Sequence, residues 1–154
     1  MKIKVGVMFG GKSVEHEISI ISAIQAIGHL NKEKYDVIPI YITKNNEFYI
    51  GEKVGDIKSY TDINSLLKES QRVIMLNEDG KVKLIRYPMK KLGKNELDYI
   101  DVAFPIVHGT NVEDGTLQGY LQMFNIPYVG CDVLSSAVGM DKYVMKTVLK
   151  DNGI

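Results

Sequence analysis

Hydrophobic and polar positions along the first third of the chain predict a strand, a helix and a second strand. Residues 3–9 form a short apolar run, rich in β-branched side chains, that ends at a Gly-Gly pair and has the pattern of a buried strand. Isoleucines then recur every three residues from Ile18 to Ile27, which predicts an amphipathic helix of about four turns with Ser13 as its N-cap. Residues 36–43 predict the second strand. This order is typical of a doubly wound parallel sheet.

The pattern continues with hairpin-like insertions between residues 44 and 98. Asn45-Asn46 predicts a turn into an arm at 47–50, and the sequence Asn-Glu-Asp-Gly at 77–80 predicts a hairpin. The other expected elements are strands at 72–76, 81–87 and 101–107, helices at 61–70, 116–124 and 135–150, a polar loop at 90–96 and a short strand or turn at 127–130. The prediction is an α/β, Rossmann-like three-layer domain with a mainly parallel sheet, decorated by inserted β-hairpins.

Composition narrows the class of protein further. The 154 residues carry no net charge, and 45% are hydrophobic and 25% charged, as in an ordinary soluble globular protein. No basic surface is indicated, so no nucleic acid partner is expected, and no apolar run is long enough to predict a membrane span. The single cysteine, Cys131, cannot form an internal disulfide, which fits a reducing cytoplasm, and we expect it to be buried.

Two loops follow predicted strands and should open at the same edge of the sheet. They are the turn at Gly10–Ser13 and the loop at His108–Gly115. Ligands of open α/β sheets bind outside the carboxyl ends of the strands, so these loops are the candidate functional site.

The first loop resembles a phosphate-binding P-loop only formally. Gly6 precedes Gly11, Lys12 and Ser13 at the spacing of that motif. The residues in between are bulky, apolar and continuous with the strand, whereas a P-loop must wrap phosphates with its backbone after the strand has ended. The dinucleotide fingerprint G-x-G-x-x-G is absent as well.

Charged side chains in the two loops have a structural and a functional interpretation. Glu15 could simply complement the dipole of the helix that it precedes, or it could accept a substrate ammonium group. His108 could be a satisfied buried imidazole, with Glu113 and Asp114 as charges at the start of a helix, or the three could serve a ligand. A metal site is not expected, because no second histidine or cysteine lies at ligand spacing.

Three motifs in order resemble those of D-alanine–D-alanine ligases. The first is GGKSVEHEIS at 10–19, and the second begins with His108-Gly109 and continues as EDGTLQG at 113–119. The third combines PYVG at 127–130 with Ser-Ser-Ala at 135–137 and Met-Asp-Lys at 140–142. The resemblance covers nearly the whole chain. It implies an ATP-grasp enzyme that uses ATP and Mg²⁺ to join two D-alanines for peptidoglycan through a D-alanyl phosphate, in the cytoplasm and as a homodimer.

The resemblance also implies a role for particular residues. Glu15 would hold the ammonium group of the first D-alanine, and His108 would lie near its carboxylate. Lys142 would reach the phosphates of ATP, as a point charge suited to that contact. The turn at Gly10 and Gly11 would face the reacting phosphate. No metal ligand is expected among these residues.

The chain departs from the family pattern in two respects. Val112 stands where the family has glycine, and a β-branched residue strongly disfavours positive φ, so either φ is ordinary there or the loop is reshaped. The sequence also stops at Ile154, before the rest of an ATP-grasp fold. We therefore expect an N-terminal domain at 1–130, followed at 131–154 by the first helix of the ATP-grasp region with an uncovered apolar side, and a piece that is inactive alone.

Alternatives to this function remain open. Ligases that use D-lactate or D-serine as second substrate share these N-terminal motifs. The chain could also be a non-catalytic dimerising module, or the first domain of another ATP-grasp enzyme such as a carboxylase or a purine-pathway ligase. The combination of Glu15 and His108 argues against the last of these.

Overall fold

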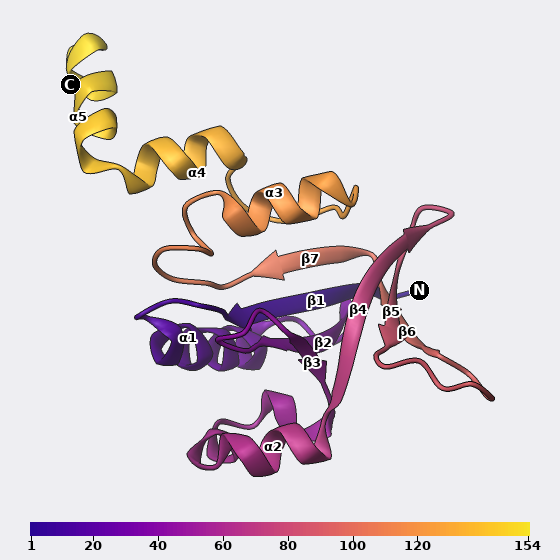
Figure 1. Ribbon diagram of the computed structural model, residues 1–154. Helices are drawn as coiled ribbons and strands as arrows, with labels where there is room; N and C mark the ends of the chain where they lie inside the picture. Colours follow the sequence, from indigo (N-terminus) through magenta and orange to yellow (C-terminus); the bar gives the residue numbers. More distant parts are fainter.

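The computed structural model describes residues 1–154 and is built on one seven-stranded sheet with strand order β6-β5-β4-β3-β2-β1-β7. The strands are β1 (Ile3–Gly10), β2 (Tyr35–Ile42), β3 (Phe48–Ile50), β4 (Gln71–Glu78), β5 (Lys81–Arg86), β6 (Glu96–Ile100) and β7 (Val102–Pro105). Figure 1 shows β1 beside β7, with the β4–β5–β6 part at the far end of the sheet. Gly6 lies inside β1, where a side chain would collide with Ile40 and Ile100, so the P-loop interpretation is excluded.

The sheet is mixed, and the prediction of a mainly parallel sheet was wrong. β1 pairs in parallel with β2 and with β7, but every pairing from β2 outward to β6 is antiparallel. Short turns can join only antiparallel neighbours, whereas parallel strands need a long crossover. The turns at Asn46 and at Asp79-Gly80, where these residues take positive φ, therefore extend the sheet with antiparallel strands, and the inserted segment continues the sheet instead of decorating it.

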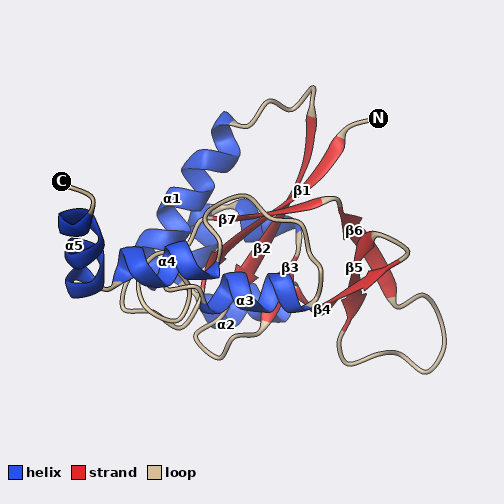
Figure 2. Cartoon of the chain, turned by 90° about the horizontal axis from the view of Figure 1, so that it is seen from above, coloured by secondary structure: helices blue, strands red, loops and turns tan.

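Helices cover both faces of the sheet, so the predicted three-layer architecture is confirmed. The helices are α1 (His16–His29), α2 (Ile63–Glu69), α3 (Thr116–Met123), α4 (Val133–Met140) and α5 (Lys142–Asp151), with short 3₁₀ turns at Glu52–Gly55 and Ile57–Thr61. α1 and α2 lie on one face and α3 on the other, while α4 and α5 project beyond it (Figures 1 and 2). None of these helices combines the length and the apolar character that a bilayer crossing needs.

The alternation of side chains along β1 divides the core between the two faces. Val7 and Phe9 are fully buried toward α1, whereas Met8 is fully buried on the face covered by α3. The second core also contains Leu84 of β5 and Ile100 of β6, so the antiparallel strands share one hydrophobic core with the parallel ones.

Four local predictions were wrong. The single helix expected at 135–150 is two helices, α4 and α5, because Asp141 takes an extended conformation (φ −86°, ψ 104°) and caps the second. Ser13 is not the N-cap of α1, a position that Glu15 occupies. Cys131 is exposed rather than buried. The strand β6 was missed, because it has only five residues and directly follows the polar loop.

Candidate functional site

The two loops predicted to converge do meet at the carboxyl ends of β1 and β7. The Asn111 side chain donates a hydrogen bond to the Lys12 carbonyl at 3.1 Å. A Cβ on Gly11 would overlap the Val112 side chain, and one on Gly109 would overlap Ser13 Oγ and lie 2.8 Å from Glu15 Oε2. Two glycines, one on each loop, therefore allow the backbones to approach this closely.

The glycine turn is held entirely by groups of the chain itself. Gly10 and Gly11 have φ of +94° and +89°, which favours glycine at both positions. The Gly10 amide donates to Ser19 Oγ at 2.8 Å, and the Gly11 amide donates to the Ile42 carbonyl at 2.8 Å. Lys12 follows with an amide that has no partner within the chain and with an exposed side chain, so Lys12 is the part of this turn that remains free to contact an anion.

Glu15 presents an uncommitted carboxylate beside the second loop. It occupies the N-cap of α1, but its side chain makes no capping hydrogen bond, and its backbone amide donates to Ser13 Oγ at 3.1 Å. The side chain is exposed, and Oε2 lies next to Gly109. Capping does not consume this acceptor, so the carboxylate can bind a cationic group.

His108 lies three residues beyond the end of β7 and is anchored to α1. It is half-buried, and its Nε2 is 3.3 Å from Ser22 Oγ. Gly109, the next residue, lies beside the Glu15 carboxylate, whereas the imidazole contacts Ser22, seven residues further along α1 than Glu15. The two loops converge, and the joint contact of the Glu15 and His108 side chains with one substrate stays a prediction.

The carboxylates of the second loop shape the loop itself. Glu113 Oε2 accepts a hydrogen bond from the Gly109 amide at 2.8 Å. Asp114 accepts from the amides of Asn111 at 2.8 Å and Thr116 at 3.1 Å, just before α3 begins. Burial of Asp114 acts to raise the pKa of its carboxyl, but these hydrogen bonds outweigh it and hold that pKa below its usual range. This favours the structural interpretation of Asp114.

Val112 settles the question raised by its β-branched side chain. Its φ is not positive; besides Gly109 and Gly115, the residue of this loop with positive φ is Asn111, at +67°. The Val112 side chain is 2% exposed and packs against Gly11. Valine therefore joins the two loops by direct packing.

Lys142 is placed apart from these loops. It is the first residue of α5, its side chain is exposed, and no hydrogen bond or ion pair joins it to either loop.

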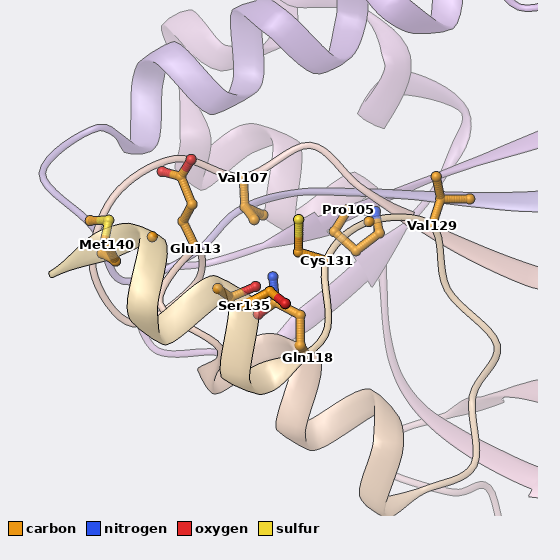
Figure 3. Close-up of a pocket in the computed structure, with 11 residues that line it drawn as sticks. Pro105, Val107, Glu113, Gln118, Val129, Cys131, Ser135 and Met140 are labelled. Carbon is orange, nitrogen blue, oxygen red and sulfur yellow. The ribbon is translucent and has the colours of Figure 1, made fainter. Parts of the chain in front are cut away.

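A pocket of about 370 Å³ lies between the end of β7, α3 and α4, with Glu113, Gln118, Cys131 and Ser135 among its lining residues (Figure 3). No group of three side chains from histidine, cysteine, aspartate or glutamate is arranged to hold a metal ion.

Sequence reasoning missed two fully buried polar residues on α1, His16 and Ser19. The His16 ring nitrogens lie 2.6 Å from the Gly11 carbonyl oxygen and 2.9 Å from the Tyr41 hydroxyl. Ser19 Oγ bridges the two loop-bearing strands, since it accepts from the Gly10 amide and donates to the Ile106 carbonyl at 2.6 Å. Their spacing of three residues, on the side of the helix that faces the sheet, is the signal that could have found them.

Comparison with known proteins gives a consistent result. Residues 4–131 match the family described as "D-ala D-ala ligase N-terminus". The D-alanine–D-alanine ligase of Thermosipho melanesiensis is 42% identical over 152 residues, which are 99% of this chain and 40% of that ligase. This chain spans well under half the length of that relative.

Two solved structures share the fold. The D-alanine–D-alanine ligase from Coxiella burnetii matches with a TM-score of 0.81 at 36% identity, over 99% of this chain and 42% of the other. VanG D-Ala:D-Ser ligase from Enterococcus faecalis matches with a TM-score of 0.78 at 36% identity, over 100% of this chain and 43% of the other.

Proposed function

The chain belongs to the family of D-alanine–D-alanine ligase N-terminal domains, and we propose that it forms the part of an ATP-dependent ligase that binds the first D-alanine. The observation that carries this proposal is the free carboxylate of Glu15, held next to the loop that begins at His108. The two loops are far apart in the sequence but adjacent in the fold. The acidic group between them, the Glu15 carboxylate, makes no capping hydrogen bond.

Glu15 accepts the ammonium group of the first D-alanine, and His108 lies beside the carboxylate of that amino acid. The ion pair fixes the substrate so that its carboxylate faces the ATP phosphates, where phosphorylation gives a D-alanyl phosphate that the amine of a second D-alanine attacks. The two loops contribute to the rate by holding the reactants in this geometry. The product dipeptide serves peptidoglycan synthesis.

The phosphates of ATP are contacted from the glycine turn and from α5. Because the Gly10 and Gly11 amides are both engaged within the chain, the glycine turn faces the reacting phosphate through the free Lys12 amide and side chain. Lys142 reaches the ATP phosphates from the start of α5. Mg²⁺ that accompanies ATP is usually held by one or two carboxylates together with the phosphates, and we assign none of these carboxylates to this chain.

The second substrate is left open by this chain. The similarity to VanG D-Ala:D-Ser ligase is nearly as strong as that to a D-alanine–D-alanine ligase, so D-serine is the specific alternative, with D-lactate a further one. We propose a cytoplasmic location, which is consistent with one free cysteine. We also propose that the protein is a homodimer, which light scattering over a concentration series would test. A purely dimerising module would dimerise without binding D-alanine.

A hybrid enzyme tests the proposal. Residues 1–154 would replace the matching N-terminal segment of the Thermosipho melanesiensis ligase, and phosphate release from ATP would be measured with and without D-alanine. We expect release that depends on D-alanine in the hybrid and none from residues 1–154 alone, because this chain spans 40% of the length of that ligase and we propose that most ATP contacts lie on the remainder.

Two substitutions decide the role of Glu15 in the hybrid. Glu15→Gln should lower kcat/KM for the first D-alanine about tenfold to a hundredfold, since it removes a charged hydrogen-bond acceptor. Glu17→Gln is the matched control, because Glu17 lies two residues further on and pairs with Lys44 at 2.8 Å, and it should leave kcat/KM unchanged. The proposal would be contradicted by a hybrid that has the melting temperature of the parent ligase but releases no phosphate in response to D-alanine. Equal effects of the two substitutions on kcat/KM would contradict it as well.

A further inference from the structure

The turn that carries Glu15 is organised around one carbonyl oxygen, that of Gly11. This oxygen accepts a hydrogen bond from the Ser13 amide at 3.0 Å and a second from the His16 ring at 2.6 Å. The backbone from Gly11 to His16 therefore closes on itself, with Glu15 projecting from it. The hydrogen bonds that fix the Gly11 carbonyl therefore also fix the backbone position of Glu15.

The His16 ring has only one tautomer that satisfies both of its neighbours. A carbonyl oxygen can only accept, so Nδ1 must carry the proton that it donates to Gly11. Nε2 then accepts from the Tyr41 hydroxyl, which stays protonated because burial, followed by the nearby charge of Glu17, raises the pKa of Tyr41 to about 12. His16 and Tyr41 are 0% and 2% exposed, so no solvent competes for these hydrogen bonds.

Packing restricts the ring further. Its edge meets the Tyr41 ring at 5.6 Å between centroids and 71° between planes. His16 Cε1 would lie 3.1 Å from a Cβ on Gly10, so the imidazole also rests against the glycine turn. The ring cannot turn without breaking both hydrogen bonds.

We propose that His16 is a positioning residue for Glu15: its imidazole, locked as the Nδ1–H tautomer between Gly11 and Tyr41, sets where the Glu15 carboxylate meets the Gly109 loop. The consequence for substrate rests on the proposed binding of the first D-alanine. The tautomer of His16 and its contacts with the first loop are properties of the chain and stand apart from that function.

The first part of the test uses the chain itself. Long-range ¹H–¹⁵N correlation spectra of the imidazole should show His16 as a neutral ring with the proton on Nδ1, the minor form of a free histidine. In His16→Phe, amide signals of Gly11 and Gly109 should shift and exchange faster with solvent, whereas in Tyr41→Phe, which leaves the bond to Gly11 in place, they should barely move. A proton on Nε2 alone, or undisturbed loop signals in a folded His16→Phe, would overturn the proposal.

The second part separates positioning from simple structural support. In the hybrid ligase, His16→Phe should raise KM for the first D-alanine about tenfold to a hundredfold, as expected for a misplaced group, with KM for ATP unchanged. His16→Asn places an amide N–H near the position of Nδ1 and should keep that KM within about threefold, although asparagine fills the buried site less well and costs more stability.

A merely structural role predicts the opposite order, in which the KM of each variant follows its loss of stability and asparagine gives no rescue. That order would overturn the proposal. A rise of the KM for ATP together with the KM for the first D-alanine would overturn it as well. If the wild-type hybrid shows no turnover with D-alanine, the proposed function fails, while the spectra of the chain still decide whether His16 positions the loop. If His16→Phe does not fold, the tautomer together with the His16→Asn kinetics decides.

Discussion

Gly11 is packed against Val112 at a positive φ, so one added methyl group tests how tightly the two loops are joined. We expect Gly11→Ala to lower the free energy of unfolding by about 2–4 kcal/mol, roughly 1 kcal/mol from the left-handed backbone and the rest from overpacking against valine. Chemical denaturation would measure it.

The matched control for this substitution is Gly80→Ala in the β4–β5 turn. Gly80 also has a positive φ, +75°, but a Cβ there would meet nothing within 4 Å, so only the backbone cost of about 1 kcal/mol should appear. In a Val112→Gly background, Gly11→Ala should cost only this backbone part, because the side chain that it overpacks is gone. Equal costs at Gly11 and Gly80, or an unchanged cost in the Val112→Gly background, would show that the loops are not in contact.

The contribution of Asp114 in the second loop to the free energy of unfolding should depend on pH. Its carboxyl pKa is lower in the folded chain than the ordinary value of 3.8, so its stabilising effect is fully present above that value and is lost as the pH falls through the folded pKa. Asp114→Asn should cost about 1 kcal/mol at pH 7, and this difference should shrink below about pH 4. Urea unfolding between pH 2.5 and 7 would test it, with the exposed Glu33→Gln as control. A difference that does not vary with pH would contradict the assignment.

Asp141 separates two helices that the apolar periodicity joins into one. Its carboxylate accepts hydrogen bonds from the amides of Tyr143 at 2.9 Å and Val144 at 3.0 Å, and its own backbone is extended. Asp141→Ala removes a cap of about 1 kcal/mol and replaces it with a strong helix former. We therefore expect ¹³C secondary shifts at residues 140–142 to become helical. Asp132→Ala, which uncaps α4, should leave them extended, and no change in Asp141→Ala would show that tertiary contacts impose the break.

Elements whose periodicity and turn chemistry agree were predictable, and elements set by distant contacts were not. β1, α1, β2 and the β4–β5 hairpin follow from apolar periodicity and from the turn residues Asn46 and Asp79-Gly80. β6 was not predictable because its five residues directly follow a polar loop and pair with β5 only in the fold. The antiparallel part of the sheet was not predictable because nothing in the sequence shows that the insert pairs with β2. At the candidate site the loops and Glu15 were predictable from position, whereas His16 was not, because its partners lie on Gly11 and Tyr41.

The whole molecule consists of a sheet unit with a shared core and a C-terminal pair of helices with little burial. α4 and α5 contain no fully buried residue, and Leu134 and Tyr143 are 72% and 82% exposed. α4 approaches the sheet unit through Val133, which lies against Gly115 and Gly119 of the second loop and α3, and its residues Ser135 and Met140 line the pocket at the end of β7. This distribution supports the proposed division at residue 130.

Truncation turns this division into a measurable prediction. Residues 1–130 should unfold in one cooperative transition with a loss of less than about 2 kcal/mol relative to the full chain, since no residue of α4 or α5 is fully buried and Val133 and Val138 are only half-buried. Residues 1–114 should not fold, because that truncation also removes Leu117 and Leu121 from the core shared by parallel and antiparallel strands. Calorimetry and heteronuclear spectra would compare the three lengths. If 1–130 lost most of its stability, α4 would belong to the sheet unit, and the loop that carries His108 would depend on it through Val133.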